Sequence, residues 1–228
     1  MAQKKTRTET GTKKASIVIV DDHPIVRQGL ADLLNEEPDL AVTSQAEDAP
    51  EAMQIIRKEK PDIVIIDVSL KETSGIELIK DIKALDSEIP ILTLSMHDES
   101  LYAERALRAG AKGYIMKQEA TDKIVNAIRT VLKGQLYLSD RMSSRILRKI
   151  VGGGVEVESS PIDRLSDREL EVFTLLGQGH GTRQISEQLH LSIKTIETYR
   201  SHIKEKLDLA DSTELLQHAI QWVNSQFQ

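Results

Sequence analysis

The sequence has no cysteine and no long hydrophobic run. The absence of cysteine excludes a disulfide framework, a thiol nucleophile and a cysteine-based zinc site. No apolar stretch approaches the length of a membrane-spanning helix, and the polar, basic N-terminus lacks the apolar segment of a secretory signal. We therefore expect a cytoplasmic protein with no membrane partner. The formal net charge of −6 argues against a protein that is basic throughout, but it leaves room for a local basic face.

At 228 residues the chain is long enough for two modest domains. We predict four parts: a flexible basic tail (1–15), a first domain (16–135), a linker (136–162) and a second domain (163–228). Within the linker, we predict a helix over 139–151. The stretch 152–162 is rich in glycine, serine and acidic residues, which predicts flexibility.

The first domain alternates short apolar strands with amphipathic helical patterns. Strands are predicted at 16–20, 40–45, 63–67, 89–95 and 113–116. Helices are predicted at 25–36, 49–59, 75–85, 99–109 and 121–133. Such a series predicts an α/β fold with a five-stranded parallel, doubly wound sheet and helices on both faces.

The second domain contains no predicted strand. Ser166 and Glu169 have the spacing of a capping box, which predicts a helix that ends near Gly177. Three more helices are predicted at 182–189, 193–207 and 212–224. This all-α pattern fits a helix-turn-helix whose second helix, 193–207, enters the major groove of DNA. A helical dimerisation or docking domain fits the periodicity nearly as well.

Three aspartates follow two apolar strands of the first domain: Asp21 and Asp22 after the first strand, and Asp67 at the end of the third. The carboxyl ends of parallel strands lie along one edge of a sheet, so these carboxylates should converge. Like charges this close need a cation or a proton, and oxygen ligands favour Mg²⁺. A single aspartate after a strand is about as often a helix cap as a functional residue. The prediction therefore depends on the three aspartates taken together with the other side chains of this edge.

Asp67 is the candidate nucleophile toward phosphorus, because it ends the central strand alone. Asp21 and Asp22 are then candidate Mg²⁺ ligands, and the backbone carbonyl of Ser69 can add another.

Three more side chains are expected at the same edge. Lys117 follows the last strand and Ser95 ends the fourth, so both can contact a phosphoryl oxygen. Tyr114, on the last strand, can swing between exposed and buried positions as Ser95 moves. Each alone is more often a solvated lysine, a loop hydroxyl or a half-buried core residue. Their order along the chain, together with the aspartates, favours the functional interpretation.

Four stretches carry a resemblance to a known family: Val18-Ile19-Val20-Asp21-Asp22-His23, Ile66-Asp67-Val68-Ser69-Leu70, Leu94-Ser95-Met96-His97-Asp98 and Ala109-Gly110-Ala111-Lys112-Gly113-Tyr114-Ile115-Met116-Lys117. On these, residues 16–133 resemble the receiver domain of two-component response regulators. Gln118 departs from the pattern, because many receivers place proline after the lysine.

The resemblance implies that Asp67 accepts a phosphoryl group from a phosphohistidine of a sensor histidine kinase. It implies Mg²⁺ at Asp22 and Asp67, with Asp21 contributing. It also implies that Ser95 and Tyr114 form the switch pair.

The predicted helix 193–207 carries a polar face opposite its core residues: Lys194, Glu197, Thr198, Ser201 and His202. Candidate phosphate contacts are Arg183, Lys194, Thr195, Arg200 and Lys204. The second domain as a whole is acidic, with seven lysines and arginines against ten aspartates and glutamates. Five of those seven lie in or beside the proposed recognition element, so we expect weak non-specific affinity and binding by paired domains.

A second resemblance comes from Leu165-Ser166-Asp167-Arg168-Glu169, Ile185-Ser186, Lys194-Thr195-Ile196-Glu197 and Lys206-Leu207. Residues 163–226 resemble the LuxR-type helix-turn-helix domain, and a receiver followed by this domain is the layout of NarL/FixJ-like regulators. The resemblance implies binding to double-stranded DNA, with Glu197, Thr198 and Ser201 facing bases.

Together these features predict a non-enzymatic transcription regulator, controlled by phosphorylation of Asp67 and dimeric when active. Two alternatives stay open: a regulator that works without phosphorylation, and a Mg²⁺-dependent phosphohydrolase with an aspartyl-phosphate. The second is weakened by Ser69, since no acid stands two residues after Asp67 to protonate a leaving group.

Overall fold

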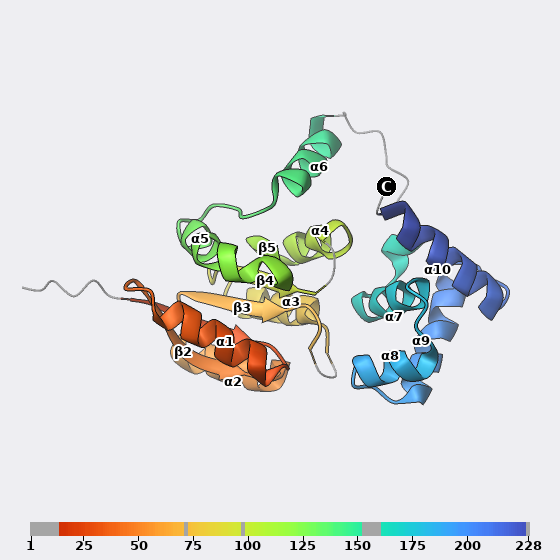
Figure 1. The fold of residues 1–228 in the computed structure, drawn as a ribbon, viewed down its shortest axis with the longest axis horizontal. Coiled ribbons are helices and arrows are strands. Elements are labelled where there is room, and N and C mark those ends of the chain that lie inside the picture. Colours follow the sequence, from red (N-terminus) through yellow and green to blue (C-terminus); the bar gives the residue numbers. More distant parts are fainter. Residues whose placement is uncertain (1–13, 71–72, 97–98, 152–160, 227–228) are drawn as a thin grey trace, which may run out of the picture.

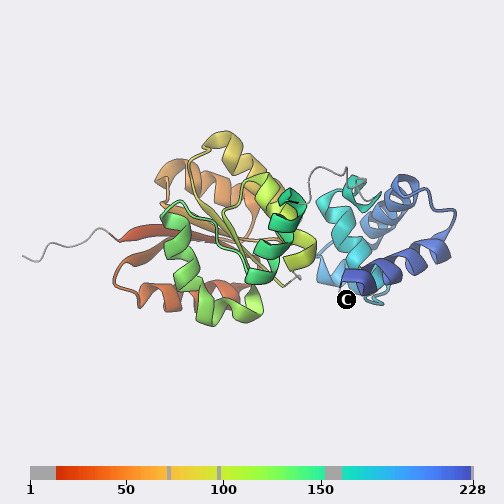
Figure 2. The ribbon, with the colours of Figure 1, turned by 90° about the horizontal axis from the view of Figure 1, so that it is seen from above.

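The computed structural model describes residues 14–70, 73–96, 99–151 and 161–226. Residues 1–13 of the predicted tail and 152–160 of the predicted linker lie outside these ranges. The described residues form an N-terminal α/β domain and a C-terminal helical domain that lie side by side along the long axis (Figures 1 and 2). Within the described ranges, no helix is long and apolar enough to cross a membrane.

Five parallel strands form one sheet in the order β2-β1-β3-β4-β5. They span Ala15–Val20 (β1), Leu40–Ala46 (β2), Ile63–Asp67 (β3), Ile91–Ser95 (β4) and Gly113–Met116 (β5). The predicted doubly wound parallel sheet is confirmed. Strand order reverses between β1 and β3, and the crevice at such a point is where this class of sheet binds ligands.

Helices cover both faces of the sheet because its central strands are apolar on both sides. Side chains alternate along β1, so Ile17 and Ile19 pack toward α1 (Pro24–Asn35) and α5 (Ala120–Leu132). Val18 and Val20 pack toward the opposite layer, which consists of α2 (Ala49–Glu59), α3 (Gly75–Leu85) and α4 (Glu99–Ala109). All four of these β1 side chains are fully buried.

Besides α5, three elements lie between β5 and the helices of the C-terminal domain. A single 3₁₀ turn, η1 (Lys117–Glu119), follows β5, and helix α6 (Asp140–Val151) packs against α4. Ser139 fixes the start of α6, since its hydroxyl donates to Glu99 Oε1 (2.6 Å) and accepts from the Met142 amide (3.1 Å). A second 3₁₀ turn, η2 (Pro161–Arg164), enters the C-terminal domain.

The C-terminal domain has four helices: α7 (Asp167–Gly177), α8 (Thr182–Gln188), α9 (Ile193–Lys206) and α10 (Ser212–Gln226). The predicted capping box at the start of α7 is confirmed, because the Glu169 amide donates to Ser166 Oγ and the Ser166 amide donates to Glu169 Oε2. Phe173 is fully buried, and its ring centre lies 5.5 Å from that of Trp222 on α10.

The apolar core of the N-terminal domain continues into the C-terminal domain. Buried residues of α2, α3 and α4 form one cluster with those of α7 to α10, and Tyr102 on α4 is fully buried. The two domains therefore share an interface, and in Figure 1 β3 points toward it.

Candidate functional site

The carboxyl edge of β1 and β3 holds three buried carboxylates. Asp21 and Asp22 follow β1, Asp67 ends β3, and the strands are neighbours in register, with Val20 opposite Ile66. The three residues are 1%, 8% and 2% exposed. Carboxylate oxygens of all three and a ring nitrogen of His23 lie within 4.8 Å of one another. The sequence prediction of a convergent acidic cluster is therefore met in space.

Lys117 offsets part of this charge. Its Nζ lies 2.6 Å from Asp21 Oδ2 and 2.6 Å from Asp67 Oδ2. Burial alone would lower the pKa of Lys117, but the charges of Asp67 and Asp21 outweigh burial and raise it. Lys117 is therefore a cation shared by two carboxylates.

The surroundings of Asp67 change its affinity for a proton. Burial raises the pKa of Asp67 to about 7, the Asp21 charge adds to the rise, and Lys117 opposes it. One lysine cannot balance three buried carboxylates, so a divalent cation fits the cluster electrostatically. The donor set supports this fit, because Asp22 is buried beside Asp21 and Asp67 and pairs with no lysine or arginine in the described part of the chain; its partner is His23 Nδ1, 2.6 Å from Asp22 Oδ1.

Glycine is required where α3 begins beside the acidic edge. The Gly75 amide donates to the Val68 carbonyl at 2.7 Å, and a Cβ at Gly75 would lie 1.9 Å from the carbonyl oxygen of Asp67. Any larger residue would push the β3–α3 loop away from Asp67. Gly75 was not among the residues predicted from the sequence, although a glycine at a predicted helix start is the signal that could have found it.

Ser95 and Tyr114 lie on one face of the sheet. Tyr114 pairs with Thr93, and Thr93 and Ser95 are two residues apart on β4, so all three side chains point toward α4. Ser95 is fully buried and Tyr114 is 3% exposed. The structure thus places the predicted switch pair next to α4, with Tyr114 in the buried position.

The C-terminal domain forms hydrogen bonds with the loop that follows Asp67. Ser69 Oγ donates to Glu171 Oε1 at 2.8 Å, and Arg168 donates to the carbonyls of Leu70 and Thr73. Arg168 and Glu171 also pair with each other at 2.6 Å, and Glu171 is fully buried. This contact was not predicted from the sequence, because charged residues in the first turns of a capped helix normally face solvent.

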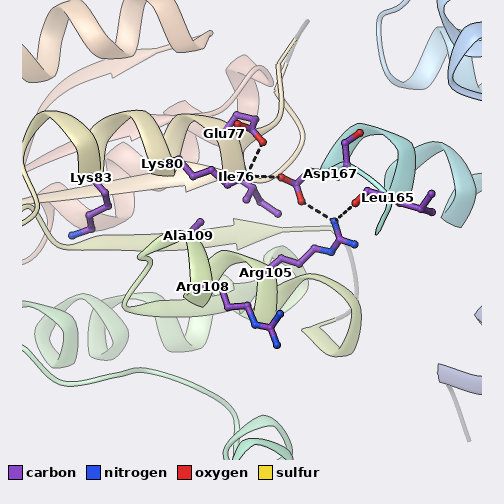
Figure 3. Close-up of a pocket in the computed structure, with 10 residues that line it drawn as sticks. Ile76, Glu77, Lys80, Lys83, Arg105, Arg108, Ala109, Leu165 and Asp167 are labelled. Carbon is purple, nitrogen blue, oxygen red and sulfur yellow. Dashed lines mark hydrogen bonds and ion pairs between the residues drawn. The ribbon is translucent and has the colours of Figure 1, made fainter. Parts of the chain in front are cut away.

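A second polar contact joins α4 to the start of α7 (Figure 3). Arg105 donates to the carbonyls of Ile162 and Leu165 and pairs with Asp167 at 3.0 Å. Lys80 on α3 approaches the other oxygen of Asp167 at 3.4 Å. Lys80, Arg105 and Asp167 line an open groove of about 640 Å³ between α3, α4 and α7.

The predicted DNA contacts lie on α8 and α9. Exposed side chains are Arg183, Lys194, Glu197, Thr198 and Ser201, and half-buried ones are Thr195, Arg200 and Lys204. Arg200 donates to Thr182 Oγ1 (2.5 Å) and to Glu197 Oε1 (3.2 Å), so both α9 side chains are held by partners within the domain. Thr182 Oγ1 in turn donates to Glu197 Oε1 at 2.9 Å.

The fold and the acidic edge together define a class: a receiver-type α/β domain that precedes a helix-turn-helix domain. Family models agree with this division. The response regulator receiver domain matches residues 17–129, and the family of bacterial regulatory proteins of the luxR type matches residues 163–219.

The chain belongs to the two-component response regulators with a LuxR-type helix-turn-helix domain. It is 36% identical over 208 residues to the oxygen regulatory protein NreC of Staphylococcus carnosus (strain TM300), which covers 90% of this chain and 96% of the relative. NreC of Staphylococcus aureus (strain MRSA252) is 39% identical over 210 residues, with the same coverage.

Among solved structures, the chain is similar to RcsB from Salmonella enterica serovar Typhimurium bound to promoter P1flhDC in the presence of phosphomimetic BeF₃⁻. The identity is 29%, the TM-score is 0.58, and the match covers 91% of this chain and 98% of that one. The protein is accordingly a DNA-binding transcription regulator of a two-component system and not a metabolic enzyme.

Proposed function

We propose that a phosphoryl group on Asp67, accepted from a sensor histidine kinase in the cytoplasm, controls DNA binding by α8 and α9. One observation carries this proposal: Lys117 Nζ lies between Asp21 and Asp67, 2.6 Å from an oxygen of each. A carboxylate oxygen of Asp67 attacks the phosphorus of phosphohistidine, the P–N bond breaks, and the leaving imidazole takes a proton.

Asp21, Asp22, Asp67 and the backbone carbonyl of Ser69 are the groups that would hold Mg²⁺, which screens the phosphoryl oxygens when it is bound. The Ser69 amide donates to Asp67 Oδ1 at 3.3 Å, so the same loop orients the acceptor. Lys117 contacts a phosphoryl oxygen after transfer, which weakens its contact with Asp21.

Ser95 and Tyr114 carry the change to the domain interface. The Ser95 hydroxyl binds the phosphoryl group, and Tyr114 follows it on the face that packs on α4. Because α4 contacts α7 through Arg105 and Tyr102, its movement loosens the C-terminal domain. Phosphorylation thus shifts an existing equilibrium between docked and released domains.

The released domains bind DNA as a homodimer. RcsB has been solved as two dimers bound to two parallel DNAs, which supports the same assembly here. We assign Arg183, Lys194, Thr195, Arg200 and Lys204 to phosphates, and Glu197, Thr198 and Ser201 to bases. Because Arg200 is held by Thr182 and Glu197, it must leave these partners or reach a phosphate alongside them. The domain limits proposed above, 16–135 and 163–228, are those we would use for separate expression.

The experiment compares wild type with Asp67→Asn and with Asp81→Asn, a control on α3 away from the acidic edge. Each full chain is incubated with acetyl phosphate and Mg²⁺. Phos-tag electrophoresis then measures phosphorylation, and retention of duplexes from a random DNA library measures binding. Wild type and Asp81→Asn should gain a shifted band and stronger retention, and Asp67→Asn should gain neither.

Three results would contradict the proposal in different ways. A shifted band without a change in DNA retention indicates a regulator that works without phosphorylation. Equal phosphodonor-dependent retention by Asp67→Asn and wild type removes Asp67 as the control point. Release of inorganic phosphate from small phosphoesters at many turnovers would revive the phosphohydrolase alternative.

A further inference from the structure

Glu197 is an acidic residue on α9, the helix that we assign to the major groove. The DNA phosphates repel a carboxylate, so its presence in the groove costs binding free energy unless a base donates a hydrogen bond to it. The donors that bases present in the major groove are the N4 amino group of cytosine and the N6 amino group of adenine. Glu197 therefore restricts which base pair can lie against α9.

Side chains of α8 and α9 hold Glu197 in place. Thr182 Oγ1, on α8, donates to Glu197 Oε1 at 2.9 Å, and Arg200 donates to the same oxygen at 3.2 Å. Arg200 also donates to Thr182 Oγ1 at 2.5 Å, so the three side chains form a closed triangle of hydrogen bonds. Glu197 Oε2 accepts no hydrogen bond from the residues that the structure describes, and the side chain is 55% exposed. One oxygen is thus anchored and the other is available to a ligand.

Ile193 is an exposed apolar residue at the start of the same helix. It is the first residue of α9 and is 53% exposed. The apolar side chains around the helix start that pack in the core of the domain are Leu191 and Ile196, so Ile193 has no packing role. An exposed β-branched residue also gains nothing from helix propensity. Burial against a partner therefore accounts for isoleucine at this position better than stability does.

The spacing of these residues places them on one face of α9. Ile193, Glu197 and Ser201 are each four residues apart, and residues at this spacing lie one above the other on a helix. Ile193 precedes Glu197 by about 6 Å along the axis, and successive base pairs are about 3.4 Å apart, so the two side chains reach bases about one or two steps apart. The first turn of α9 contains no acidic residue, and the N-terminal residues of a recognition helix are those that contact base edges.

We propose that Glu197 accepts a hydrogen bond from the N4 amino group of a cytosine, and that Ile193 contacts the C5-methyl group of a thymine about one or two base pairs away. Cytosine is favoured over adenine because adenine presents its N7 acceptor beside N6, where it repels the carboxylate. Thr182 is a positioning residue, which touches no base and keeps Glu197 in reach of the cytosine. This inference rests on the proposed function, in which Glu197 faces a base and Ile193 and Thr182 have no role.

The first test selects duplexes from a random DNA library with the full chain, with and without acetyl phosphate and Mg²⁺, and sequences the bound fraction. Wild type should enrich a half-site with C and T about one or two base pairs apart, on either strand. Glu197→Gln should replace C by A at that one position, because glutamine forms two hydrogen bonds with adenine; each protein should favour its own base about tenfold. The matched control is Glu205→Gln, an exposed residue about two turns further along the same face, which should select the wild-type half-site.

Thr182→Val tests the positioning role. It removes the hydroxyl group and keeps the volume of the side chain, so the preference for C should fall about fivefold. Thr182→Ser, which keeps the hydroxyl group, should retain the preference. If Thr182 were only structural, Thr182→Val would weaken binding to all sequences equally and leave the preference at this position unchanged.

Deoxyuridine tests the contact of Ile193, because it differs from thymidine only by the C5-methyl group. Replacing the selected T by U should weaken binding by wild type about fourfold, which corresponds to burial of one methyl-sized group. The replacement should not weaken binding by Ile193→Ala. Ile220→Ala on α10, where the residue is 38% exposed, should respond like wild type.

Two results would overturn the inference: selection of the same base by Glu197→Gln and wild type, or an equal loss on U for Ile193→Ala and wild type. Retention that does not depend on acetyl phosphate contradicts only the proposed function. Base preferences are ratios of affinities, so they test the roles of Glu197 and Ile193 in either case.

Discussion

The receiver and the C-terminal domain bury charged residues for different reasons. In the receiver, the buried charges Asp21, Asp22, Asp67 and Lys117 meet at the end of two strands and are held mainly by one another. In the C-terminal domain, Arg168 and Glu171 lie on α7 and are buried against the receiver. Buried charge therefore marks the candidate phosphorylation site in the receiver. In the C-terminal domain it marks the contact surface with the receiver.

The difference also concerns stability. Desolvated like charges at the receiver edge cost free energy until a cation arrives, whereas the α7 charges are paired and bonded to carbonyls. Removing a carboxylate from the receiver edge should consequently stabilise the metal-free protein, whereas removing a charge from the α7 pair should destabilise it. Four variants test this comparison.

The largest effect is expected from the core of the C-terminal domain. Phe173→Ala removes a fully buried ring, which should lower the free energy of unfolding by about 4 kcal/mol. Urea denaturation followed by fluorescence measures this change, because Trp222 is the only tryptophan of the chain and packs on Phe173. Ile220→Ala on α10, where the residue is 38% exposed, is the control with a small effect. Equal loss of receiver stability by circular dichroism would show that the two domains unfold as one unit.

Breaking the buried α7 pair should release the C-terminal domain. Glu171→Ala leaves Arg168 without its carboxylate partner and removes the acceptor of Ser69 Oγ, at a cost of about 3 kcal/mol. Faster hydrogen exchange across the β3–α3 loop and a larger radius of gyration should follow. The control is Glu187→Ala, since the Arg183–Glu187 pair is exposed and its loss should cost under about 0.5 kcal/mol. An unchanged radius of gyration would mean that the apolar contacts of α7 suffice.

Removing a carboxylate from the receiver edge should increase the free energy of unfolding, whereas the two variants above decrease it. Asp22→Asn should raise the stability of the metal-free protein by on the order of 1 kcal/mol, because it relieves repulsion among three buried carboxylates. Added Mg²⁺ should raise the melting temperature of wild type but not of Asp22→Asn. Asp32→Asn, on the exposed side of α1, should behave like wild type. A less stable Asp22→Asn protein that still responds to Mg²⁺ would show that Asp22 has a structural role.

The smallest effect is expected at the α7 capping box and depends on pH. Burial would raise the pKa of Glu169, but Lys206 and Ser166 outweigh it and hold the pKa below its ordinary value. A depressed pKa contributes stability at neutral pH that is lost as the pH falls through the folded-state value. Lys206→Met should therefore cost roughly 0.5 kcal/mol at pH 7 and little near pH 3, as measured through Trp222. If Lys206→Met lowers the free energy of unfolding equally at both pH values, Lys206 stabilises the protein through packing and not through its charge.

Much of the receiver could be predicted because its signals are local. Short apolar strands predict burial on both faces, and the aspartates after β1 and β3 need only the parallel arrangement to converge. The sequence signal for the Ser166–Glu169 capping box is equally local, and the capping box is confirmed. Arg168 and Glu171 carried no such signal, since their partners in the receiver are about 100 residues away in the sequence.

The sheet, the helices and the gathering of carboxylates at the strand ends follow from local features of the chain, because strand periodicity and chain direction decide them. The pairing of the charges depends instead on how distant elements pack together. Lys117 reaches Asp21 and Asp67 but not Asp22, and α7 meets the loop after Asp67. Pairing depends on distances of a few ångströms between elements from different parts of the chain, and no local pattern encodes those distances.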